Sequence, residues 1–309
     1  MTRQALLLIA LGALAATAGP AHAQAVPPIS LTQLPHVSII SPVFYWSDAA
    51  DVVRMASATC PKGRPIAGGV AIQKGSASLR IQETYPDGES WVTRIVNRKT
   101  PDSTQPLEVR AFAVCLLPSA RVSSIQLSQF PRLTQQSQAF SIPPGGGATG
   151  GRAVCPSGTL VISGGFGLDP KSQGSGAHIE QSFPDTAGWN VKAASASTPQ
   201  AAAEARSYAI CLGSGEGLSI QDYRSVDFVD AEVALKPDAG AVRQAIKCRS
   251  ASSHAIGGGA RLVRGKNAAI ELQESFPDSP SSWTVALANR ADRKAGDARV
   301  KLYAVCMNP

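Results

Sequence analysis

Hydrophobic and polar residues alternate along most of this chain in short runs. The runs are rich in Val, Ile, Thr and aromatic residues, and clusters of Gly, Pro, Asp and Ser separate them. Alternation with a period of two is typical of β-strands that bury one face. No window of a dozen residues has a convincing helical period. The pattern therefore predicts an all-β protein.

One set of landmarks recurs three times, so the chain contains an internal repeat. Each copy has a first Cys, a glycine pair, an Ile/Leu-x-x-x-aromatic-Pro-Asp motif, a Trp and a closing aromatic-Ala-x-Cys motif. We place the copies at residues 37–117, 122–213 and 218–309, with about six strands in each. The glycine pairs are assigned to Gly68-Gly69, Gly164-Gly165 and Gly257-Gly258, and the tryptophans are Trp91, Trp189 and Trp283.

Each copy holds one cysteine near its start and one near its end, at almost constant separation. Six cysteines allow many pairings, but the recurrence of both cysteines in every copy favours pairing within a copy. The expected disulfides are Cys60–Cys115, Cys155–Cys211 and Cys248–Cys306. The predicted fold is thus three tandem, disulfide-stapled antiparallel β modules. They could be sandwich-like beads, or they could close into one pseudo-threefold prism.

The first residues have the features of a secretory signal peptide. A basic start is followed by a short apolar run and by Ala21-His22-Ala23, so cleavage is expected near Gln24. Residues 1–23 would then be the signal, and residues 24–36 a short N-terminal arm. The protein is expected to be exported, to the periplasm or outside the cell, where disulfides persist. No later apolar run reaches the roughly 18 residues of a membrane helix.

Charge and reactive residues narrow the functional classes. The formal net charge is +7, yet only 17% of residues are charged and no Lys/Arg block occurs, which argues against nucleic-acid binding. The mature chain holds His36, His178 and His254, each at a different place in its copy, and no hydrolase or zinc motif. We therefore expect no enzymatic activity, no cofactor and no metal. The aspartates after the recurring Pro fit turn chemistry, with calcium ligation as the alternative; they are Asp87, Asp185 and Asp278.

The motifs resemble those of secreted bacterial repeat proteins that carry Cys-Pro-x-Gly, Gly-Gly, Trp-x-x-x-x-x-Asn and Tyr-Ala-x-Cys. The resemblance covers all three copies. Copy three departs from it at Cys248-Arg-Ser-Ala251, and copy two has Ser195 in place of the Asn. The resemblance implies export and a β module. It does not point to any particular activity.

Strict alternation predicts which side chains share a face. It puts Glu83 on the same face as Leu79, Ile81 and Tyr85, and it does the same for Gln181 and Glu274 in the other copies. Such a polar group on an apolar face would accept backbone hydrogen bonds at the turn, or it would orient a ligand. The tryptophans are expected in the core beside the disulfides, with a sugar-stacking platform as the alternative.

The closing strand provides the candidate binding site. Its cysteine face is aliphatic, and its other face pairs a cation with an aromatic residue two positions on. A pair of this kind, presented three times, could bind a carbohydrate or an anionic surface polymer by stacking and charge. The alternative is a structural envelope or surface-assembly protein that acts through protein–protein contacts; the sequence identifies no partner. The candidate residues are Arg110, Phe112, Arg206, Tyr208, Lys301 and Tyr303.

Overall fold

The structure, a computed structural model, describes thirteen segments of the chain. They are residues 36–46, 53–61, 63–74, 79–97, 107–117, 132–145, 147–169, 176–195, 202–213, 226–237, 240–265, 269–291 and 296–308. The expected signal peptide at residues 1–23 and all but the last residue of the expected arm at 24–36 lie outside them. Within the described segments all regular secondary structure is β-strand, which confirms the predicted fold class.

Every repeat forms the same succession of strands. Repeat 1 contains β1 (His36–Ile40), β2 (Val43–Trp46), β3 (Val53–Thr59), β4 (Arg64–Lys74), β5 (Leu79–Asp87), β6 (Ser90–Asn97) and β7 (Leu107–Leu117). Repeat 2 contains β8 (Arg132–Ile142), β9 (Thr149–Val154), β10 (Thr159–Leu168), β11 (His178–Pro184), β12 (Gly188–Ala194) and β13 (Ala203–Gly213). Repeat 3 contains β14 (Val226–Leu235), β15 (Val242–Lys247), β16 (His254–Arg264), β17 (Ile270–Ser279), β18 (Ser282–Asn289) and β19 (Ala298–Met307). Only repeat 1 splits its first strand in two.

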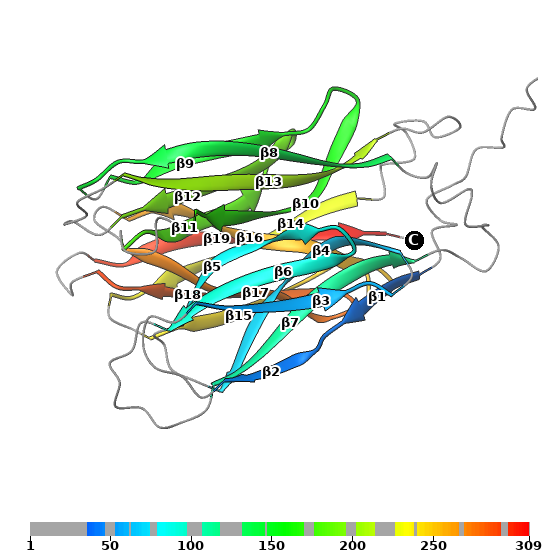
Figure 1. Cartoon of the computed structure of the whole chain (residues 1–309), viewed down its shortest axis with the longest axis horizontal. Coiled ribbons are helices and arrows are strands. Elements are labelled where there is room, and N and C mark those ends of the chain that lie inside the picture. The colour runs from blue at the N-terminus through cyan, green and yellow to red at the C-terminus, as the bar shows by residue number, and fades with distance from the viewer. Residues whose placement is uncertain are drawn as a thin grey trace, which may run out of the picture.

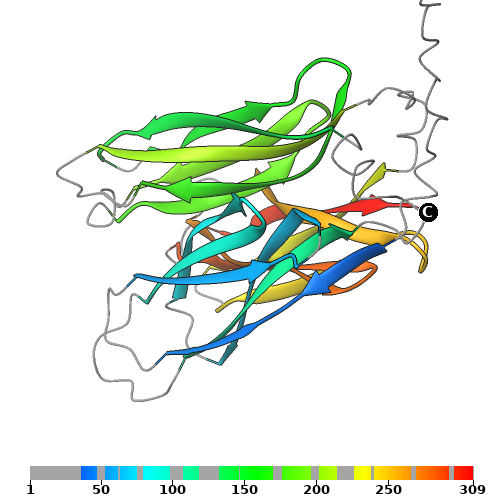
Figure 2. The same ribbon diagram turned by 45° about the vertical axis from the view of Figure 1, so that its right-hand side comes forward.

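Each repeat divides its strands between two sheets, so that every sheet belongs to two repeats (Figures 1 and 2). We name the sheets by the repeats that build them. The strand order is β1-β7-β4-β17-β18-β15 in sheet 1/3, with β2 also on β7, β3-β6-β5-β10-β13-β8 in sheet 1/2 and β14-β19-β16-β11-β12-β9 in sheet 2/3. The two halves of a sheet meet at a seam, formed by β4 and β17, β10 and β5, or β16 and β11.

This sharing of sheets decides between the two arrangements that the sequence left open. A chain of independent beads would keep each sheet within one repeat. Instead the three sheets enclose a common hydrophobic core that draws on all three repeats. Ile66, Ile162 and Ile256 occupy equivalent places in that core, and each is at most 1% exposed. The protein is therefore one closed pseudo-threefold body.

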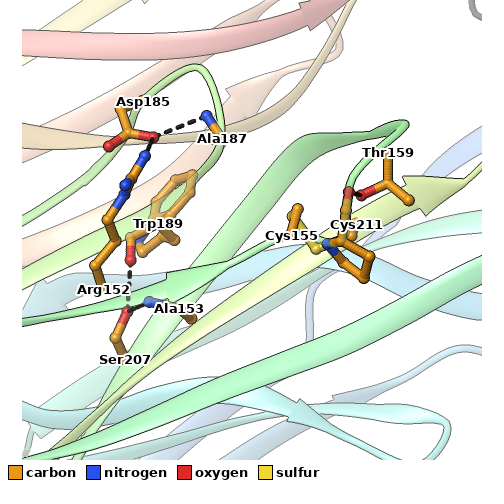
Figure 3. The surroundings of a disulfide bond; sticks show 10 residues. Arg152, Ala153, Cys155, Thr159, Asp185, Ala187, Trp189, Ser207 and Cys211 are labelled. Carbon is orange, nitrogen blue, oxygen red and sulfur yellow. Dashed lines mark hydrogen bonds and ion pairs between the residues drawn. A yellow bond between two sulfur atoms is a disulfide. The ribbon is translucent and has the colours of Figure 1, made fainter.

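The three disulfides pair within the repeats, as predicted, but each one joins two different sheets. Cys60 follows β3 in sheet 1/2, and its partner Cys115 lies on β7 in sheet 1/3. The other two disulfides link sheet 2/3 to sheet 1/2 and sheet 1/3 to sheet 2/3 in the same way. Near Cys155–Cys211 the buried Ser207 makes a second link, because its hydroxyl donates to the carbonyl oxygen of Trp189 at 2.7 Å (Figure 3).

The three repeat tryptophans lie in the core, which confirms that interpretation over the sugar platform. Their exposed fractions are 0% for Trp91, 1% for Trp189 and 2% for Trp283. A buried indole N–H needs an acceptor, and each finds a hydroxyl of its own repeat. The donor–acceptor pairs are Trp91–Thr84 at 2.7 Å, Trp189–Ser182 at 2.8 Å and Trp283–Ser275 at 2.9 Å.

The two glycines of each pair make room for different neighbours. A Cβ on Gly68 would collide with the Trp91 ring of the same repeat. A Cβ on Gly69 would collide with the carbonyl oxygen of Ser275, across the seam in repeat 3. The first glycine thus accommodates the Trp, and the second allows two repeats to approach backbone to backbone.

Repeat 3 shifts this glycine assignment by one residue. There it is Gly258 that faces Trp283 and Gly259 that faces the carbonyl oxygen of Ser182 across the seam. The pair equivalent to Gly68-Gly69 is therefore Gly258-Gly259, and our assignment to Gly257-Gly258 was wrong. The run of three glycines in this copy hid the register.

A β-bulge overturns the expected face of Glu83. In β5, Ile81 lies opposite Ile95 and Glu83 lies opposite Arg94 on the next position of β6, so Gln82 is an extra residue. A bulge of this kind exchanges the faces that follow it. Leu79 and Ile81 point into the core, whereas Glu83 and Tyr85 lie on the outer face. The same bulge precedes Gln181 and Glu274.

Candidate functional site

The three cation–aromatic pairs of the closing strands lie on the outer faces of the sheets, next to the seams. Each aromatic ring stacks on the aromatic ring of the Pro-Asp motif from another repeat. Sequence reasoning had not paired these two motifs. The stacked pairs and their ring-centroid separations are Phe112–Phe276 at 5.1 Å, Tyr208–Tyr85 at 4.9 Å and Tyr303–Phe183 at 6.0 Å.

The second glycine of each pair explains why these rings can meet. Gly165 lies beside Tyr208 in β13 and beside the Thr84–Tyr85 step of β5. Having no side chain, it leaves space above the strand in which the two tyrosine rings stack. Such a pair contributes roughly 0.5–1.5 kcal/mol beyond its buried area. Each seam therefore joins two repeats through a glycine and a stacked aromatic pair.

The stacked aromatic residues of the three seams differ in how much of their surface is exposed. Phe112, Phe276 and Phe183 are only 6–8% exposed, whereas Tyr303, the partner of Phe183, is half-buried. Tyr85 and Tyr208, which form the pair of the 1/2 seam, are both half-buried and carry hydroxyl groups. Burial raises the pKa of Tyr208 to about 12 and also raises the pKa of Tyr85. Both phenols therefore keep their protons near neutral pH and can donate hydrogen bonds.

Two of the three candidate cations face a carboxylate. Arg206 Nη2 lies 3.9 Å from Glu204 Oε1, and Lys301 Nζ lies 3.1 Å from Asp230 Oδ2. No carboxylate of the described residues lies within ion-pair distance of Arg110. The three pairs thus share a position in the fold but present different charges.

The buried Glu/Gln/Glu position is tied to a cation in two of the sheets. Glu83 Oε2 lies 3.0 Å from Arg94 Nη1, and Glu274 accepts two hydrogen bonds from Arg243 at 2.6 and 2.7 Å. Glu274 also accepts a backbone hydrogen bond, from Ile72 N at 2.6 Å. That donor belongs to repeat 1, so the carboxylate helps to hold the 1/3 seam together instead of capping the adjacent turn.

A hollow of about 170 Å³ opens beside the tyrosine pair of the 1/2 seam. Its walls combine one aromatic ring with three carboxylates and one guanidinium group. Burial raises the pKa of Glu83, against the opposing effect of Arg94. Carboxylates and a guanidinium around an aromatic ring can accept and donate hydrogen bonds to a polyhydroxylated ligand. The lining side chains are those of Tyr208, Glu83, Asp169, Glu204 and Arg206.

The aspartates of the Pro-Asp motifs act in turns in two copies. Asp185 accepts hydrogen bonds from Ala187 N at 2.9 Å and from Arg152 at 2.7 Å (Figure 3). It also accepts one from Asn190 at 2.8 Å. Asp278 accepts one from the Ser282 hydroxyl. Among the described residues no group of three His, Cys, Asp or Glu side chains could hold a metal ion. The contacts favour the turn interpretation of these aspartates over calcium ligation.

A polar cluster where β5, β11 and β17 meet was missed at the sequence level. Arg80, His178 and Glu271 occupy the same position in β5, β11 and β17, three strands that contact one another. Arg80 and Glu271 form an ion pair, and Arg290 Nε lies 3.0 Å from Glu271 Oε2. The signal was present in the sequence, because three different polar residue types replace one another immediately before the Ile/Leu of the motif.

Glu180 provides a pH-dependent prediction in this cluster. It is the bulge residue of β11, where the other copies have Gln82 and Gln273. Burial raises its pKa to about 7, which Lys192 only partly opposes. Because the pKa of this carboxyl is higher in the folded than in the unfolded state, the free energy of unfolding of the protein falls as the pH rises from about 4.5 through 7. We expect Glu180→Gln to raise the free energy of unfolding by up to about 3 kcal/mol at pH 8 and to change it little at pH 4.

Urea unfolding of both forms at the two pH values measures this effect. Half-buried His178, whose Nε2 lies 3.9 Å from Glu180 Oε1, has a pKa lowered by desolvation and is neutral at pH 8. It therefore provides no compensating charge there. An equal gain at pH 4 and pH 8 would assign the effect to packing and contradict the titration argument.

Comparisons with known proteins add no relative: no family model and no curated protein matches the chain. The described residues contain no helix that is long and apolar enough to span a membrane. Their cysteines are all disulfide-bonded. The disulfides are compatible with an exported protein.

Proposed function

We propose that this protein is an exported, non-catalytic binding protein that contacts a carbohydrate at its seams, with the 1/2 seam as the principal site. One observation carries the proposal: Tyr208, which stacks on Tyr85, lines a hollow together with three carboxylates and an arginine. Aromatic faces pack against the C–H surface of a sugar ring, while carboxylate and guanidinium groups bind its hydroxyls. Such a mixture of an aromatic wall and a few polar groups suits a small-ligand site.

The charges also bear on the choice between a neutral sugar and a polyanion. The hollow at the 1/2 seam has carboxylates from Glu83, Asp169 and Glu204, which would repel a polyanion. The 2/3 seam is more basic, because Arg261 lies over the Phe183 ring at 5.4 Å. A neutral glycan is therefore the favoured ligand of the 1/2 seam, and acidic groups would bind at the 2/3 seam.

The three seams face outward from three sheets that surround one core. Sites with this arrangement cannot all lie on one flat surface. They can engage different strands of a polymer network, and the overall affinity of several linked sites then exceeds that of each weak site alone. The proposal is thus that of a cross-linking, multivalent binder. A structural role through protein contacts remains the alternative.

A glycan and envelope-polymer array with the mature protein tests the proposal. Tyr208→Ala is expected to weaken binding of a neutral glycan at least tenfold, as loss of a central aromatic anchor does. Glu83→Gln is expected to weaken it at least tenfold as well, because the substitution removes a charged hydrogen-bond acceptor of the hollow. Tyr45→Ala is the matched control, because Tyr45 lies on β2, away from the 1/2 seam, and is 69% exposed. The triple variant Arg110/Arg206/Lys301→Ala measures the contribution of the seam cations to polyanion binding.

Two outcomes would count against carbohydrate binding. Absence of binding to every polymer on the array would move the weight to the structural alternative, especially if the wild type forms oligomers in solution. An equal loss of binding in Tyr45→Ala and Tyr208→Ala would show that glycan binding does not depend on the 1/2 seam.

A further inference from the structure

A second and larger hollow, of about 400 Å³, lies on the outer face of sheet 1/3. Its volume is within the range of small-molecule pockets. Side chains of β1 and β7 from repeat 1 form one wall, and the β17–β18 turn and the start of β16 from repeat 3 form the other. The apolar lining consists of Val37, Ile39, Phe112, Pro277 and Pro280, and the polar lining of Ser41, Arg110, His254, Asp278 and Ser279.

Arg110 is the unusual member of this lining. Its Nε is buried, and no hydrogen-bond acceptor of the described residues reaches it. A buried donor without a partner costs about 1–3 kcal/mol. Its counterparts in the other repeats, Arg206 and Lys301, each face a carboxylate. Arg110 thus places a guanidinium that has no carboxylate partner among the described residues in the wall of a pocket.

The split first strand of repeat 1 accounts for the difference from repeat 3. In sheet 2/3 the continuous β14 carries Asp230, the ion-pair partner of Lys301, opposite Tyr303. In sheet 1/3 the chain turns at Ser41 and resumes as β2, which puts Val43 opposite Arg110. Neither β1 nor β2 contains a carboxylate, so these strands offer Arg110 no partner of the kind that β14 offers Lys301. Pro42 accepts a hydrogen bond from Ala111 N at 3.1 Å, which holds the break close to β7.

The other charged group of the hollow does not neutralise Arg110. Asp278 accepts a hydrogen bond from the Ser282 hydroxyl, and among the described residues it forms no ion pair with the Arg110 guanidinium. His254, at the start of β16, adds an imidazole ring to the wall that contains Asp278. The hollow therefore combines one unpaired cation with an apolar surface of aliphatic, aromatic and proline side chains.

We propose that this hollow, which we name the Arg110 pocket, binds a small carboxylic acid with an apolar body. The carboxylate accepts hydrogen bonds from the Arg110 guanidinium. The apolar body packs against Ile39, Phe112 and Pro277. A charged hydrogen bond of this kind is short and strong, and burial of the body adds roughly 0.8 kcal/mol for each methylene group. This site and ligand class are independent of carbohydrate binding at the 1/2 seam.

Titration calorimetry of the mature, disulfide-bonded protein with octanoate tests the proposal. We expect saturable binding of octanoate and at least tenfold weaker binding of octylamine, which has the same apolar body and the opposite charge. Arg110→Met is expected to weaken octanoate binding at least tenfold, because it removes the charge and keeps an apolar stem. Arg110→Lys is expected to bind more tightly than Arg110→Met, because it keeps the charge.

Arg206→Met is the matched control, since Arg206 occupies the equivalent position in repeat 2 and is expected to leave octanoate binding unchanged. Near-ultraviolet circular dichroism checks that the variants fold. If Arg110→Met does not fold, the comparison of octanoate with octylamine on the wild type and the Arg110→Lys variant still decides. Absence of octanoate binding at millimolar concentration, equal binding of octylamine, or an equal loss in Arg206→Met would overturn the proposal.

Discussion

Removing one disulfide is expected to lower the free energy of unfolding by about 4 kcal/mol. The loops that the three disulfides close span 55, 56 and 58 residues, and the chain-entropy model assigns nearly the same value to each of them. The variant Cys60→Ala/Cys115→Ala tests the first of them. Alanine is preferable to serine because both cysteines are at most 1% exposed, and a buried hydroxyl would need a partner.

Urea unfolding of the wild type and of the three paired Cys→Ala variants measures the loss. Because each disulfide joins a different pair of sheets around one core, we expect three similar losses. A variant that loses less than about 1 kcal/mol would show that its two sheets are held mainly by packing, contrary to the argument. Two separate unfolding transitions in the wild type would contradict the closed body itself.

The pairing of these cysteines could be predicted from the sequence, and the closure of the body could not. Identical repeats contain strands that can pair within one copy or between two, and both arrangements satisfy the same alternation. The second glycine of each pair was the available signal, because a glycine inside a strand often marks a close backbone approach. Gly69 and Gly165 have this role, and each faces a carbonyl group of another repeat.

The candidate site was predicted in part. The cation–aromatic pairs do lie on the outer faces, but their stacking partners Tyr85, Phe183 and Phe276 were assigned to the apolar face of their strands. A single bulge residue in each copy, such as Gln82, moves them to the outer face. Bulges leave no dependable mark in a hydrophobic pattern, since one inserted residue only shifts the alternation. The meeting of the cation–aromatic pair and the aromatic-Pro-Asp motif at a seam therefore could not be predicted from the sequence.

Substitution at the second glycine should show how strongly the seams hold the body together. We expect Gly165→Ala to lower the free energy of unfolding by about 3 kcal/mol or more. Its Cβ would collide with the carbonyl oxygen of Thr84 and would lie 2.9 Å from the Thr84 carbonyl carbon. Both are backbone atoms of a packed strand, so relief requires that β5 and β10 separate, and overpacking of this kind is costly.

Gly240→Ala is the control for this substitution. Gly240 is exposed, and a Cβ there would meet nothing within 4 Å, so a change within about 0.5 kcal/mol is expected. Urea unfolding compares the two variants. A chain of independent repeats would place no backbone against Gly165, and its substitution would then resemble that of Gly240. A large loss of unfolding free energy in Gly165→Ala alone therefore measures the contact between repeats 1 and 2. The same glycine lies beneath the Tyr85–Tyr208 pair, so this variant should also bind neutral glycans less tightly.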